Sequence, residues 1–167
     1  MKKQYILIGL SLYISLFIYL FYRTERTIVN EIVIGLISKA TYTNLKATIA
    51  HSLPLNDVMI YSLPGGLWTF CITLTSKPYY IDLNRWRIDC VYIPLIFCCS
   101  LEMLQLIHLT NGRFDFMDIV FFVSFWLLGR SDSSGCIEKR HILTTLNSET
   151  ILCLVSYSIV YLAHVLK

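Results

Sequence analysis

The feature that most constrains this chain is a set of long apolar runs from which charged residues are almost absent. The charges stand between the runs, an arrangement that suits a bilayer rather than a fold facing water. Composition agrees, because 56% of the 167 residues are hydrophobic and only 15% are charged. The sequence therefore predicts one all-α membrane domain over 1–167, a polytopic bundle of transmembrane helices.

Five of these runs are predicted to span the membrane, because charged or turn-forming residues bound each of them. The spans lie near 6–22, 58–76, 90–110, 117–129 and 150–166. The fourth falls short of the roughly 17 to 25 residues that a span usually needs, and it can extend through Phe114 and Phe116 or thin the bilayer locally.

Between the first and second spans, the segment 27–50 has the periodicity of a helix with one apolar face. Its apolar residues recur at helical spacing, while Asn30, Glu31, Lys39 and Asn44 interrupt them. A helix of this kind buries one face in the headgroup region instead of crossing the bilayer. We therefore expect an amphipathic interfacial helix over 27–50.

The second span contains Pro64, Gly65 and Gly66, and we expect these residues to break it. Pro64 has no amide hydrogen to donate, and its ring frees the carbonyl of Ile60. Unpaired backbone at that depth is tolerated only inside protein or beside a wet cavity, so the break is predicted to open a gap toward the third span. The alternative is that Gly65 and Gly66 allow close helix packing.

Basic residues predict the orientation of the chain. With a cytoplasmic N-terminus, eight of the 14 basic residues fall inside and six outside. The eight are Lys2, Lys3, Lys77, Arg85, Arg87, Arg130, Lys139 and Arg140. The N-terminus is then cytoplasmic, the C-terminus lies outside, and the connection 111–116 is extracytoplasmic.

Polar side chains follow one face of the third span. Glu102, Gln105 and His108 are three residues apart, which places them within a face about 120° wide. Glu102 is eight residues from the outer end of this span, or about 12 Å at the helical rise. An ionised carboxylate there costs several kcal/mol unless it is paired, hydrated or protonated. The face therefore lines a polar cavity, or Glu102 is neutral and holds neighbouring helices together.

The connection after this span is predicted to fold back over the polar face. Asn111 and Gly112 form a strong turn signal, which carries Arg113 over the mouth of that face. Asp118 falls in the first turn of the next helix, where capping is an alternative role. We predict one cluster at the outer mouth, either a ligand site or a structural fastening: Glu102, Gln105, Arg113, Asp115 and Asp118.

The same stretch resembles a known family. Glu102 and Gln105, then the sequence GRFDFMD and finally Gly129 are similar to the pattern of VanZ-like integral membrane proteins. Phe122 and Phe125 stand where that family usually has an asparagine and a glycine. The resemblance implies a small multi-pass protein of the bacterial cytoplasmic (inner) membrane, linked in some members to resistance to teicoplanin-type glycopeptides.

Two classes of function follow. In the first, a non-enzymatic envelope protein binds a polar or lipid-linked head group, or another membrane protein, with Arg113 contacting an anion. The alternative is an intramembrane enzyme acting on a lipid-linked envelope substrate, with Glu102 or Asp118 as acid or base.

Motifs for other chemistry are missing from the sequence. It contains no HExxH motif and no phosphate-cradling glycine loop, so a catalytic assignment has little support. The six cysteines lack paired CxxC spacing, and we expect no metal and no cofactor. A net charge of +3 is too small and too dispersed for nucleic-acid binding.

Overall fold

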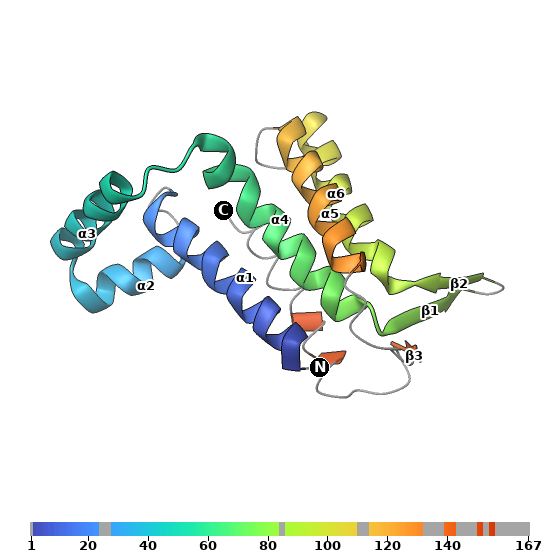
Figure 1. Cartoon of the computed structure of the whole chain (residues 1–167). Coiled ribbons are helices and arrows are strands. Elements are labelled where there is room, and N and C mark those ends of the chain that lie inside the picture. The colour runs from blue at the N-terminus through green and yellow to red at the C-terminus, as the bar shows by residue number, and fades with distance from the viewer. Residues whose placement is uncertain are drawn as a thin grey trace.

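The computed structural model of this chain is mostly helical, with a small sheet that the all-α prediction did not include. It describes residues 2–23, 28–83, 86–109, 114–131, 139–142, 150–151 and 154–155. The helices are α1 (Lys2–Phe21), α2 (Ile28–Ile37), α3 (Lys39–Ser52), α4 (Asp57–Ser76), α5 (Ile93–Leu106) and α6 (Phe116–Ser131) (Figure 1). A short 3₁₀ turn, η1 (Cys90–Tyr92), precedes α5. The strands are β1 (Tyr79–Leu83), β2 (Trp86–Asp89) and β3 (Arg140–His141).

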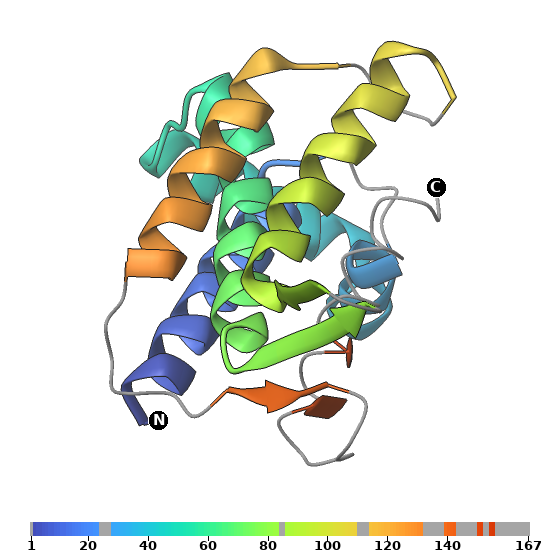
Figure 2. The same cartoon turned by 90° about the vertical axis from the view of Figure 1, so that its right-hand side faces the viewer.

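The bundle is built around α4, which contacts α1, α5 and α6. These four helices alternate in direction along the chain, so that α5 leads into α6 at one end and the sheet lies at the other (Figures 1 and 2). We call these the α5–α6 end and the sheet end. By length and composition, α1 and α4 can cross a membrane, whereas α5 and α6 are 14 and 16 residues long.

Three of the predicted spans correspond closely to observed helices. The helices α1, α4 and α6 begin and end within a few residues of the predicted 6–22, 58–76 and 117–129, and α6 is longer than expected. The third span was predicted to reach residue 110, but α5 ends at Leu106. The predicted fifth span, 150–166, lies outside the described residues except at 150–151 and 154–155, which are helical.

The prediction that α4 is broken at Pro64 is wrong. The helix runs without interruption through Asp57–Ser76, with Pro64 buried inside it. The carbonyl of Ile60, which Pro64 cannot bind, accepts a hydrogen bond from Nε of Arg23 at 3.5 Å, and Nη2 of Arg23 donates to the carbonyl of Tyr61 at 2.8 Å. A side chain from the end of α1 thus supplies the donor that proline removes, so the helix continues.

Gly65 and Gly66 serve close packing, which was the alternative interpretation. A Cβ on Gly65 would lie 2.8 Å from Cε1 of Phe122, and one on Gly66 would lie 2.5 Å from Cδ2 of Phe125. Both rings belong to α6, which therefore packs directly against this part of α4. Phe122 and Phe125 are therefore the packing partners of the two glycines.

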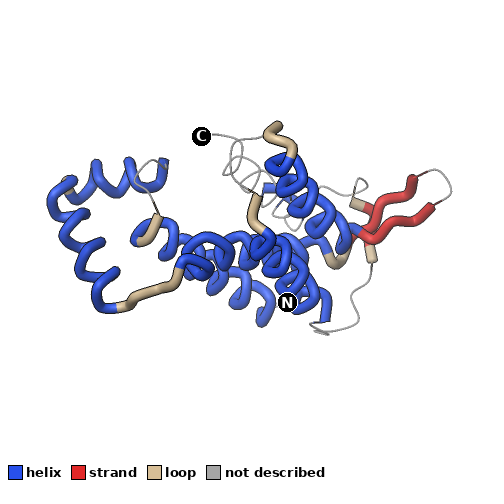
Figure 3. Tube along the Cα trace, turned by 90° about the horizontal axis from the view of Figure 1, so that it is seen from above, coloured by secondary structure: helices blue, strands red, loops and turns tan. Residues whose placement is uncertain are grey.

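The segment 27–50, which was predicted to be one interfacial helix, contains two helices. The chain breaks at Ser38, which has a positive φ of 68°, between α2 and α3. Together these helices form an arm that projects to one side of the bundle (Figures 1 and 3). Tyr42 of α3 holds the arm, because its hydroxyl lies against the carbonyl of Leu20 and donates to Oδ1 of Asn30 at 3.2 Å.

The sheet has the strand order β2-β1-β3. β1 pairs antiparallel with β2, with Ile81 opposite Ile88 and Asp82 opposite Arg87, and it pairs parallel with β3. Its base is packed by Tyr79 and Cys90, both buried, against Ile93 at the start of α5. The sheet therefore closes the bundle where α4 ends and α5 begins.

Candidate functional site

The α5–α6 end contains a buried carboxylate, Glu102, whose residue is only 3% exposed. Its Oε2 accepts a hydrogen bond from the backbone N–H of Asp115, at 3.4 Å. Glu102 is four residues from the end of α5, or about 6 Å at the helical rise, rather than the 12 Å expected from a longer span. The carboxylate therefore lies near the mouth of the bundle.

The backbone after α5 explains why the helix ends early. The N–H of Leu109 donates to the carbonyl of Leu104 at 2.9 Å, and the N–H of His108 donates to that of Gln105 at 3.0 Å. His108 has a positive φ of 57°, so the three features together form a Schellman motif. His108, considered in the sequence as part of the polar face, is instead the residue that ends the helix.

Asp115 begins α6. Its Oδ1 accepts from the N–H of Met117 at 2.9 Å, and its carbonyl accepts from the N–H of Asp118 at 3.1 Å. The capping role considered for Asp118 thus belongs to Asp115. Because the N–H of Asp115 also donates to Glu102, a carboxylate of α5 takes the place that a glutamate of the same helix has in a capping box.

Negative charge accumulates around Glu102. The carboxylates of Asp118 and Asp115 both lie close enough to repel a charge on it. The N-terminus of α6 offsets part of this repulsion, because the aligned peptide dipoles of the helix place a partial positive charge at that end. Gln105 is half-buried one turn beyond Glu102. Arg113, the predicted basic member of the cluster, lies outside the described residues.

Below Glu102 the space between α4 and α5 is filled. Cys98, one turn earlier on α5, is buried against Thr69 of α4, with 3.3 Å between Sγ and Oγ1. Thr69 also donates to the carbonyl of Gly65 at 3.0 Å. The polar region is therefore shallow and confined to the mouth. The sequence did not predict the contact between Cys98 and Thr69, because cysteine and threonine are common within transmembrane helices.

The described residues contain no group of three His, Cys, Asp or Glu side chains placed to hold a metal ion. What the arrangement offers is a set of hydrogen-bond acceptors at the edge of an apolar bundle. Comparisons with protein-family models, with curated proteins and with solved structures find no match for this chain.

Proposed function

We propose that this chain is a VanZ-like, multi-pass protein of a bacterial cytoplasmic membrane, and that α1, α4, α5 and α6 all cross the bilayer. Its proposed function is non-enzymatic: the α5–α6 end binds a polar or lipid-linked head group of the cell envelope. The resemblance of Glu102, Gln105 and the following connection to that family supports the assignment.

The apolar outer surface of the bundle supports a lipid environment. Exposed large apolar side chains occur on every helix of the bundle, for example Ile6 and Leu10 of α1, Ile96 of α5 and Leu128 of α6. Soluble monomers rarely expose apolar surface on this scale, whereas a bilayer covers it at no cost. The short α5 and α6 fit a bilayer that is locally thin.

The observation that carries the binding proposal is the position of Glu102. A carboxylate buried beside two others is costly unless a donor or a cation compensates it, and the amide of Asp115 is a single neutral donor. A head group with hydroxyl, amide or ammonium donors would add to the one donor, the amide of Asp115, that the described residues direct at Glu102. Arg113 is the proposed contact for an anionic part of the same ligand.

The test is teicoplanin susceptibility in a host made to express the chain. We expect expression to raise the minimal inhibitory concentration of teicoplanin, and Glu102→Gln and Arg113→Ala to abolish that rise while membrane abundance stays normal. Asp82→Asn is the matched control, because Asp82 is an exposed carboxylate at the opposite end. It should leave resistance unchanged.

Two results would contradict the proposal. Wild-type expression without any change in susceptibility removes the resistance role. Loss of protein in step with loss of resistance in both Glu102→Gln and Arg113→Ala makes these two residues structural, because the removal of either partner from a buried pair of opposite charges typically destabilises by about 3–5 kcal/mol.

A further inference from the structure

The β1–β2 hairpin has two chemically different faces. Cross-strand partners lie on the same face of a hairpin, and successive residues alternate between faces. Ile81 and Ile88 are partners on one face, which Trp86 shares because it stands two residues before Ile88. Asp82 and Arg87 are partners on the other face.

The apolar face is buried at the base of the hairpin and uncovered toward its tip. Tyr79 at the base is buried with Cys90, and Ile81 and Ile93 of α5 both pack against these two residues. Farther out, Ile88 is 42% exposed and Trp86 is 78% exposed. The face is therefore turned toward the helix that follows it, and among the described residues nothing covers its outer half.

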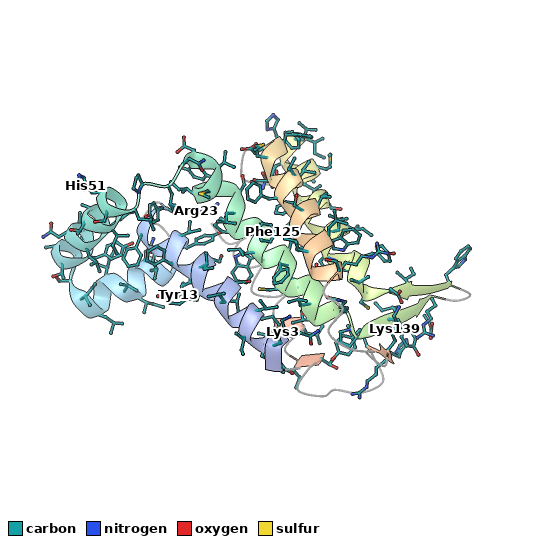
Figure 4. The ribbon with its side chains drawn as sticks, viewed as in Figure 1. Lys3, Tyr13, Arg23, His51, Phe125 and Lys139 are labelled. Atoms are coloured by element: carbon teal, nitrogen blue, oxygen red, sulfur yellow. The ribbon has the colours of Figure 1, made fainter. Side chains whose placement is uncertain are left out.

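The polar face is occupied by charged groups and their partners. The guanidinium of Arg87 lies over the ring of Tyr80, 3.5 Å from its centroid. Asp89 forms an ion pair with Lys139, which Figure 4 labels at the sheet end. The edge of the Tyr80 ring meets His141 of β3. These contacts leave this face suited to water.

The hairpin also lies at the depth where a membrane surface is expected. α4 ends at Ser76, and β1 begins at Tyr79. Lys77 donates to the carbonyl of Gly129 at 3.1 Å, which ties this point to the end of α6. The hairpin extends outward from these helix ends, crosswise to α5 and α6 (Figures 1 and 3).

We propose that the β1–β2 hairpin lies in the headgroup region of the cytoplasmic leaflet, with Ile81, Ile88 and Trp86 facing the acyl chains and Arg87 facing water. Tryptophan favours this region, where its ring is apolar and its N–H stays near water. The proposal rests on the membrane arrangement proposed above.

The experiment places the full-length protein in vesicles of equimolar phosphatidylcholine and phosphatidylglycerol whose acyl chains carry bromine near the carbonyl end. Bromine quenches nearby tryptophan, and the difference between wild type and Trp86→Phe isolates the emission of Trp86. We expect most of that emission to be lost to bromine and little of it to aqueous iodide. As a matched control, a tryptophan placed by Asp82→Trp in the Trp86→Phe protein should be quenched by iodide instead.

Quenching of Trp86 by iodide but not by bromine would overturn the proposal. Protection of Trp86 from both quenchers would also overturn it and would indicate that protein, such as a second copy paired with β2, covers the face. Trp68 of α4, isolated by Trp68→Phe, separates the two proposals. If bromine near the methyl end of the acyl chains quenches Trp68 but no bromine quenches Trp86, the hairpin proposal fails and the membrane arrangement stands. If bromine quenches neither tryptophan, the hairpin proposal and the membrane arrangement both fail.

Discussion

At the scale of single residues, two glycines set how closely α6 approaches α4. Phe122 and Phe125 lie where side chains on Gly65 and Gly66 would have to be. From the sequence alone, two glycines beside a proline predict a broken helix, because the sequence of one helix does not show which residues of another helix pack against it. The packing alternative is correct since large residues of α6 match small ones of α4.

Gly66→Ala should destabilise the protein by about 1–3 kcal/mol, the usual cost of overpacking a filled interior. Gly9→Ala in α1 is the control: nothing lies within 4 Å of the added methyl, and alanine is the better helix former. Thermal unfolding in detergent measures both. If the loss at Gly66 arises from the Phe125 ring, Phe125→Leu should recover part of it; equal stability of Gly66→Ala and Gly9→Ala would refute the packing account.

At the scale of elements, the apolar runs were sufficient to predict α1, α4 and α6, because each run has no competing pattern. The hairpin was missed for a different reason. Tyr79, Ile81, Trp86 and Ile88 alternate with polar residues at the spacing of strands, but no strand was predicted between the second and third spans. Similarly, the end of α5 depends on the positive φ of His108. A glycine at this position would have predicted the end of the helix, because glycine adopts positive φ readily, but a histidine does not.

The link between α1 and α4 gives a prediction at this scale. Arg23→Met should destabilise by about 1.5–3 kcal/mol, because it removes charge-assisted hydrogen bonds to the carbonyls of Ile60 and Tyr61. In a Pro64→Ala protein the amide at position 64 can bind the Ile60 carbonyl, so Arg23→Met should cost less there. A double-mutant cycle in detergent measures the difference.

The control for this cycle is Arg87→Met, which removes a different arginine, one that lies over Tyr80 far from Pro64. Its effect should be the same with either residue at position 64. Strict additivity of Arg23→Met and Pro64→Ala would show that Arg23 does not compensate for the proline.

At the scale of the whole molecule, the two ends of the bundle differ in charge. Arg87, Arg130, Lys139 and Arg140 lie in or beside the sheet with Asp82 and Asp89, while the α5–α6 end contains Glu102, Asp115 and Asp118. Arg23 lies beside the start of α4. At the sheet end, the guanidinium of Arg130 lies 5.2 Å from the ring centroids of both Tyr92 and Trp126, which adds a basic and aromatic belt at that end. Helical spacing and a turn signal placed Glu102 and Asp115 in one predicted cluster, and the hydrogen bond from the backbone N–H of Asp115 to Glu102 joins the two residues. The role of the cluster stays a prediction.

Labelling of introduced cysteines in intact cells tests the central claim most directly, namely that this is a membrane bundle whose carboxylate mouth is extracytoplasmic. Leu109 is exposed beside that mouth and Lys139 is exposed at the sheet end, so Leu109→Cys and Lys139→Cys place one thiol at each end. With the wild-type background subtracted, a membrane-impermeant thiol reagent should label Leu109→Cys in intact cells and Lys139→Cys only after lysis. The reverse pattern would invert the orientation, and equal labelling of both in a soluble fraction would contradict the membrane account.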